Sequence, residues 1–123
     1  MKYILITLVI FQLALSTAKA ETWSCAHKGT FEDPEALVVI VYKRVGDHFI
    51  IAQRADLKFE IQYESNRVLV LTNHDIREDQ EIAVWNTLLI DKWNGKAKSS
   101  WTGLWAKSPS LNTAYPKTCT KSD

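Results

Sequence analysis

Short apolar stretches separated by polar turns run along most of the chain after its first 20 residues. The alternation is clearest between Leu57 and Tyr63, where every second residue is apolar. A period of two places these side chains on one face of a β-strand. A two-residue turn at 65–66 then predicts a returning strand over 67–73, in a register that sets Tyr63 opposite Val68.

The same pattern predicts further strands along the chain. Residue pairs 46–47 and 94–95 contain glycine and are typical of tight hairpin turns. In contrast, 74–80 is polar and indicates a loop or one helical turn, and 107–117 holds two prolines and indicates irregular chain. We therefore predict an all-β fold, an antiparallel meander of about seven strands forming a small barrel or a sandwich. The expected strands are 22–31, 36–44, 48–54, 57–64, 67–73, 81–91 and 97–106.

The first 20 residues have the three parts of a secretory signal peptide. Lys2 gives a positive start, residues 4–15 are mostly apolar, and the small residues Ala18 and Ala20 suit a signal peptidase. The apolar run of about a dozen residues is short of the roughly 20 that a membrane-spanning helix needs. We expect a signal peptide over 1–20, a periplasmic or secreted β domain over 21–123, and no stable membrane insertion after cleavage.

Cys25 and Cys119 are the only two cysteines of the chain. In an exported protein both thiols meet an oxidising compartment, where a disulfide persists. No C-x-x-C motif favours the alternative, a redox or metal-binding pair. The sequence therefore predicts a structural Cys25–Cys119 disulfide, which would stabilise the domain by about 4–5 kcal/mol in the chain-entropy account.

The charge balance of the mature chain argues against two classes of partner. Loss of the two leader lysines from 15 basic residues leaves 13, against 14 acidic residues, and like charges form no long run. Nucleic-acid-binding domains and basic membrane-surface domains carry a clear positive excess. We therefore expect neither kind of partner.

Histidine–carboxylate pairs are the candidates for catalysis. The mature chain has His27, His48 and His74, and Asp75 follows His74 directly. Neighbours on a strand point to opposite faces, so sequence alone does not arrange this pair for catalysis. No G-x-S-x-G motif supplies a serine nucleophile, and the disulfide uses both thiols. We expect no enzymatic activity and no catalytic residue; a small hydrolase that uses His74 with Asp75 or Asp91 is the alternative.

Metal and cofactor sites have no supporting motif in the chain. It lacks H-E-x-x-H, clustered Cys and His, and an EF-hand loop, and its four glycines are too scattered to cradle a phosphate. The acidic groups within 32–35 and 75–79 leave a weak calcium site as the alternative to solvated loops. We expect no metal and no cofactor.

Tryptophan is the most distinctive residue type, with five in the chain. Trp93, Trp101 and Trp105 lie close together in sequence, and Trp101 and Trp105 share one face of a predicted strand about 13 Å apart. Such rings can stack on sugars or hold a peptide, whereas in many small domains they fill the core. We treat these three as the candidate ligand-binding residues, for an unidentified protein or glycan partner.

Three short motifs carry a resemblance to other proteins. They are Trp-Ser-Cys at 23–25, Ile-Asp-Lys-Trp-Asn-Gly-Lys at 90–96 and Tyr-Pro-Lys-Thr-Cys at 115–119. In this layout the chain resembles small exported bacterial β proteins with a terminal disulfide, and the resemblance implies no particular activity. In size, strand content and disulfide it is also similar to periplasmic lysozyme inhibitors, although their Ser-Gly-x-x-Tyr loop has no counterpart here.

These observations favour an exported, non-enzymatic binding or structural domain whose partner is unknown. A periplasmic lysozyme-type inhibitor is the first alternative, on the strength of the resemblance. The hydrolase based on His74 is the second.

Overall fold

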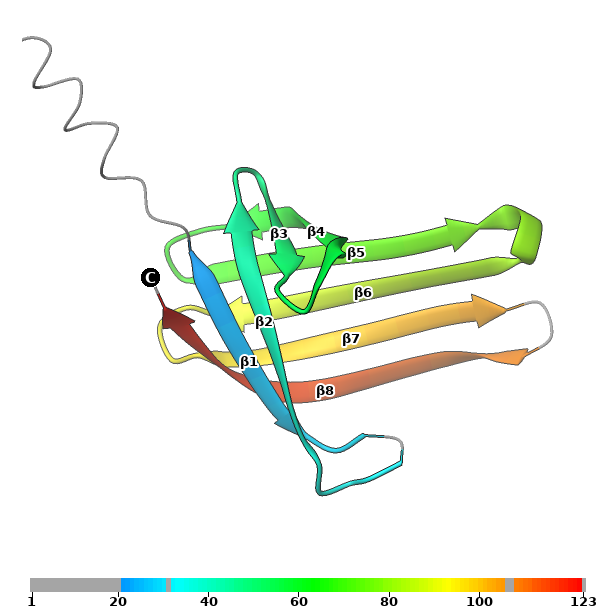
Figure 1. Cartoon of the computed structure of the whole chain (residues 1–123), viewed down its shortest axis with the longest axis horizontal. Coiled ribbons are helices and arrows are strands. Elements are labelled where there is room, and N and C mark those ends of the chain that lie inside the picture. Colours follow the sequence, from blue (N-terminus) through cyan, green and yellow to red (C-terminus); the bar gives the residue numbers. More distant parts are fainter. Residues whose placement is uncertain (1–20, 31, 106–107, 123) are drawn as a thin grey trace, which may run out of the picture.

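Eight antiparallel strands close into a barrel in the computed structural model (Figure 1). The structure describes residues 21–30, 32–105 and 108–122, with the side chains of 105 and 108–112 left out. Strands follow one another round the barrel in chain order, and β8 returns to pair with β1. The elements are β1 (Thr22–Lys28), β2 (Leu37–Val45), β3 (His48–Ile51), β4 (Arg54–Glu64), β5 (Val68–Arg77), η1 (Glu78–Gln80), β6 (Ile82–Asp91), β7 (Lys96–Trp105) and β8 (Ser108–Ser122).

The two ends of the barrel differ. In Figure 1, β1 and β2 run diagonally across one half of the long strands β6 to β8 and leave the other half uncovered. We call the end with the β2–β3, β4–β5 and β6–β7 turns the closed end, and the end with η1 the open end. The buried hydrophobic core has inward-facing residues from strands on all sides of the barrel: Trp23, Cys25, Tyr42, Phe49, Phe59, Leu69, Leu71, Leu88, Ile90 and Cys119.

The predicted all-β meander is confirmed, with eight strands where about seven were expected, and of the two architectures left open it forms the barrel; the predicted disulfide is also present. Cys25 on β1 lies directly opposite Cys119 on β8, and their sulfurs are bonded over 2.03 Å. Because β1 and β8 are the first and last strands, this bond crosses the seam at which the barrel closes. A sheet that closes in this way has no exposed edge along the paired residues.

The expectation of irregular chain over 107–117 was wrong. Residues 108–122 form β8, which pairs with β7 along most of its length, for example Pro116 opposite Lys98. Pairing with β1 begins only at Thr118. Pro116 therefore lies where β8 has an edge position on its β1 side, and a residue without an N–H group is tolerated there.

The expected loop at 74–80 is also mostly strand. Residues 74–77 continue β5 and pair with the start of β6, with His74 opposite Trp85 and Arg77 opposite Ile82. Only η1 is helical, and Glu81 follows it in the left-handed conformation with φ of 53°. This end of the β5–β6 ladder extends beyond the half of the barrel that β1 and β2 cover, and polar residues can therefore form a strand here.

The predicted register of the β4–β5 hairpin was wrong by two positions. Tyr63 pairs with Val70, because the turn is longer than two residues and the ladder shifts between Ile61 and Tyr63. Ser65 forms this turn: its N–H donates to the Val68 carbonyl oxygen over 2.8 Å, and its hydroxyl accepts from the Val68 N–H over 3.0 Å. The shift turns Tyr63 outward, and its side chain is 58% exposed.

Candidate functional site

A cavity of about 620 Å³ opens into the barrel beyond the core, toward the open end. Its volume lies within the roughly 300–1,000 Å³ of small-molecule sites. The buried side chains of Tyr42, Phe59 and Leu88 line the part next to the core. Ile40 and Ile51 add apolar surface from β2 and β3. The surface of the lining is therefore mostly apolar, although about half of the lining residues are polar or charged.

The inward positions of three neighbouring strands explain the cavity. Along β5 the inward residues change from Leu71 to Asn73, and along β6 from Leu88 to Asn86. On β7 the small Ser99 faces the same space. The Asn86 amide donates to the Asn73 side-chain oxygen over 3.4 Å. Short side chains cannot fill the interior of an eight-stranded barrel, so space remains for a ligand.

The three candidate tryptophans do not form one surface. Trp101 is half-buried and lines the cavity. Trp93 lies in the β6–β7 turn at the closed end, where it is 71% exposed and the Arg67 guanidinium lies 4.7 Å from its ring centroid. Trp105 is the last residue of β7, and its side chain lies outside the described part of the structure. Of the three, Trp101 is the residue that the structure places at a site.

Lys117 lines the same cavity and was not among the candidate residues. Its side chain projects inward from β8, and the residue is only 7% exposed. Burial lowers the pKa of its ammonium group from the ordinary lysine value. The sequence did contain one indication that Lys117 faces inward: it lies two residues before Cys119, and alternate residues of a strand share a face. It was missed because the segment was expected to be irregular.

His27 and Tyr115 accompany Lys117 at the wall of the barrel. Their ring centroids are 5.2 Å apart, and Tyr115 lines the cavity with Lys117. Burial, and secondarily the charge of Lys117, lowers the pKa of His27. The Nδ1 atom of His27 is buried and has no hydrogen-bond partner among the described residues. The cluster thus combines a buried cation with an unsatisfied polar atom.

The residues of the hydrolase alternative each contact other partners. The His74 ring stacks on Trp85 with centroids 5.0 Å apart, whereas the Asp75 carboxylate lines the cavity and binds Arg77 over 2.8 Å. Asp91 pairs with Arg67 and accepts a hydrogen bond from the Trp93 N–H, six ladder positions from His74. The described residues therefore present no His74–Asp pair for proton transfer.

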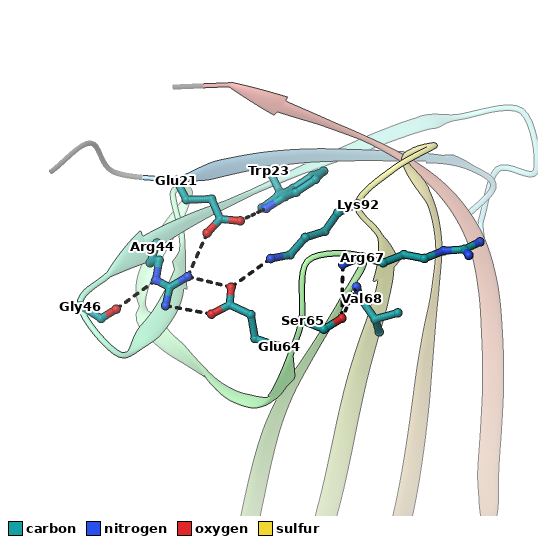
Figure 2. Close-up of polar contacts among 9 residues, drawn as sticks. All are labelled: Glu21, Trp23, Arg44, Gly46, Glu64, Ser65, Arg67, Val68 and Lys92. Carbon is teal, nitrogen blue, oxygen red and sulfur yellow. Dashed lines mark hydrogen bonds and ion pairs between the residues drawn. The ribbon is translucent and has the colours of Figure 1, made fainter. Parts of the chain in front are cut away.

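A network of ion pairs lies at the closed end of the barrel (Figure 2). Arg44 contacts Glu21 over 3.0 Å and Glu64 over 2.9 Å, and Lys92 contacts Glu64 over 3.2 Å. The Trp23 indole N–H donates to Glu21 over 2.7 Å. Hydrogen bonding from Arg44, followed by the bond from Lys92, holds the pKa of Glu64 below its usual range. Each charge in this network has a partner, so it is structural and contrasts with Lys117.

Comparison with family models, with curated protein sequences and with solved structures finds no match for this chain. Fold and cavity together define a closed antiparallel β-barrel with a ligand-sized internal space at one end. In the described residues, no helix is long and apolar enough to cross a membrane. The same residues hold no group of three or more His, Cys, Asp or Glu side chains arranged to bind a metal ion.

Proposed function

We propose that this protein is an exported, non-enzymatic binding domain that holds a small, largely apolar molecule in its barrel. The observation that carries this proposal is the cavity of about 620 Å³, which is open at one end and has a mostly apolar surface. Small-molecule sites are typically concave and apolar, with a few polar groups that orient the ligand. Mouths of β-barrels are a common place for them.

The shape of the site favours a small molecule over the protein or glycan partner expected from the tryptophans. A protein partner needs a broad surface, of roughly 800 Å² on each side for a standard interface. Trp93 is exposed but lies at the other end of the barrel, so it does not extend the cavity lining. Trp101 is in the wall, where it adds apolar contact and reports on ligand entry through its fluorescence.

Export remains part of the proposal, and two observations are compatible with it. The Cys25–Cys119 disulfide suits an oxidising compartment outside the cytoplasm. Glu21, the residue that would follow the cleaved leader, is held by Arg44 and Trp23. N-terminal sequencing of the protein recovered from the periplasm or medium is expected to begin at Glu21. A chain that keeps residues 1–20 would contradict the cleavage.

Binding is tested with 1-dodecanol, a neutral apolar probe, added to the oxidised protein and followed by isothermal titration calorimetry and tryptophan fluorescence. We expect saturable binding with one site. Ser99→Phe places a large ring in the cavity and should abolish it. Ser122→Phe, the same change at an exposed position, is the matched control and should bind as the wild type does. Absence of saturable binding, or equal binding by Ser99→Phe, would overturn the proposal.

A further inference from the structure

We propose that the ligand of this cavity is an anionic amphiphile, a single carboxylate on an aliphatic chain, and that Lys117 binds the carboxylate. This inference rests on the proposed function, because it names the class of molecule that the same cavity holds. Two observations support it: a buried cation in the cavity wall that belongs to no ion pair among the described residues, and a buried histidine nitrogen beside it that has no hydrogen-bond partner there.

The first observation is the state of Lys117. The residue is more than nine-tenths buried and lines the cavity. None of the ion pairs among the described residues includes it, although Arg44, Arg54, Arg67, Arg77 and Lys92 each have a carboxylate partner. Burying a charged group without a counter-charge is strongly unfavourable. An anion in the cavity would supply that counter-charge.

The second observation is the group next to Lys117. His27 has a buried Nδ1 atom without a hydrogen-bond partner among the described residues, and the charge of Lys117 acts on its ring. Protonated or as the Nδ1–H tautomer, imidazole donates a hydrogen bond to a carboxylate oxygen. His27 does not line the cavity itself: with Lys117 it borders a smaller hollow in the barrel wall, so its unpaired nitrogen lies beside the cation and Lys117 is the residue that faces the bound anion.

The cavity's own carboxylate does not compete for Lys117. Asp75 lines the cavity from β5, but its side chain is bound by Arg77 through three hydrogen bonds of 2.8–3.2 Å. The other titratable groups that face Lys117 are His27 on β1, Tyr42 on β2 and Tyr115 on β8. Burial raises the pKa of Tyr42 to about 12, so it is neutral at physiological pH. Tyr42 therefore supplies no counter-charge to Lys117.

The rest of the lining determines the remainder of the ligand. Ile40, Ile51 and Leu57 present aliphatic surface from β2 to β4, and Trp101 presents an aromatic surface from β7. An aliphatic chain is stabilised here because its binding removes apolar area from water. A phosphate head group is less suited to this site, since phosphate sites usually offer a guanidinium fork or several cations. One ammonium group matches one carboxylate.

The test compares dodecanoate with dodecanol, which share the chain and differ in the head group. At pH 7 and below the concentration of micelle formation, calorimetry should show dodecanoate binding about tenfold or more tightly than dodecanol, because a charge-assisted hydrogen bond is added. Lys117→Met keeps the length and apolar stem of the side chain and should remove this preference while dodecanol still binds. Circular dichroism at increasing temperature checks that the variant is folded.

The dependence of dodecanoate affinity on pH distinguishes a direct Lys117–carboxylate ion pair from a general disturbance of binding by the Lys117 substitution. Dodecanoate affinity should fall as pH rises through the lowered pKa of Lys117, and dodecanol affinity should not change. Lys117→Arg should keep the preference for dodecanoate and lose the pH dependence, because guanidinium stays charged. An unchanged profile in Lys117→Arg would overturn the role of Lys117.

The outcomes distinguish the two proposals. If dodecanol binds and dodecanoate binds no more tightly, the carboxylate inference fails and the apolar site stands. If dodecyl phosphate binds more tightly than dodecanoate, the head group is wrongly assigned. If neither dodecanol nor dodecanoate binds, the proposed function fails as well.

Discussion

Gly95 in the β6–β7 turn lies against the main chain of Cys119 on β8. The Cys119 N–H donates a hydrogen bond to the Gly95 carbonyl oxygen over 2.6 Å. A Cβ atom on Gly95 would meet the Cys119 carbonyl oxygen, and the residue has a φ of 74°. A turn and the strand that carries the disulfide are thus joined at a point where only glycine fits.

Gly95→Ala is expected to destabilise the protein more than Gly46→Ala. Both glycines have positive φ, but a Cβ on Gly46 would meet nothing within 4 Å. Gly46→Ala therefore reports the conformational cost alone, about 1 kcal/mol. Gly95→Ala adds overpacking against backbone and should lower the free energy of unfolding by about 1–3 kcal/mol more. Urea unfolding of the two variants gives the difference, and equal losses would show that the contact with Cys119 is unimportant.

Removing the disulfide is expected to lower the thermal midpoint strongly. Cys25 and Cys119 are separated by 94 positions, so the bond closes a loop that includes most of the domain. Its loss should reduce the free energy of unfolding by about 2–5 kcal/mol. The measurement compares the Cys25→Ala/Cys119→Ala variant with the wild type, with and without a reductant. The reductant should shift the wild type alone; a variant as stable as the oxidised wild type would contradict the prediction.

The closed-end network makes stability depend on acid pH. The pKa of Glu64 is lowered by hydrogen bonds from Arg44 and Lys92, so the folded state favours the charged carboxylate. Its contribution is complete above the unfolded glutamate pKa and is lost as pH falls through the lower, folded pKa. Glu64→Gln should flatten the wild-type loss of stability in that range. Thermal melts from pH 7 to pH 3 measure the effect, and parallel profiles would contradict it.

Arg44→Met is expected to lower the free energy of unfolding by about 1–2 kcal/mol, since it breaks bonds to two partly exposed carboxylates. Arg54→Met is the matched control, because the Arg54–Asp56 pair is mostly exposed. Exposed pairs contribute little, so this variant should be nearly as stable as the wild type. If chemical denaturation shows the same loss of stability for both variants, the Arg44 ion pairs contribute no more than an exposed pair does.

Lys117→Met is expected to stabilise the ligand-free protein. The pKa of Lys117 is lower when folded than when unfolded, so its burial penalty is complete below the folded pKa and is relieved as pH rises toward the unfolded value. The advantage of the variant should therefore be largest at neutral pH and shrink at alkaline pH. Lys121→Met, at an exposed position of the same strand, serves as the control for thermal melts. A destabilised Lys117→Met at neutral pH would show that the ammonium is compensated.

Local patterns in the sequence determined the face of a strand wherever the strand was regular. In 81–91 the period of two sets Leu88 and Ile90 on one face and Trp85 and Leu89 on the other; the structure buries the first two and exposes the second two. Side-chain alternation is a property of a single strand, so it needs no knowledge of the partner. The disulfide was predictable for a similar reason, because the chain offers no other cysteine.

The pairing of strands was decided only by the tertiary structure. The shift between Ile61 and Tyr63 depends on the partner strand and on the Ser65 turn, neither of which the alternation in 57–63 contains. Pro116 lacks an N–H group, which is unfavourable in a strand. β8 forms nevertheless, because β7 pairs with it along its other side. Long-range pairing determines register and closure, and a local pattern does not encode it.

The candidate site was likewise only partly predictable from the sequence. Sequence reasoning chose Trp101 for its type, and the structure places it in a cavity wall. It could not show that Lys117, Tyr42 and Asn86 face one space, because these residues lie on β8, β2 and β6 and meet only when the barrel closes. The sequence by itself therefore determined the all-β class, the faces of the regular strands and the covalent link. Closure of the barrel decided where the core ends, which charge is buried without a partner, and where a ligand fits.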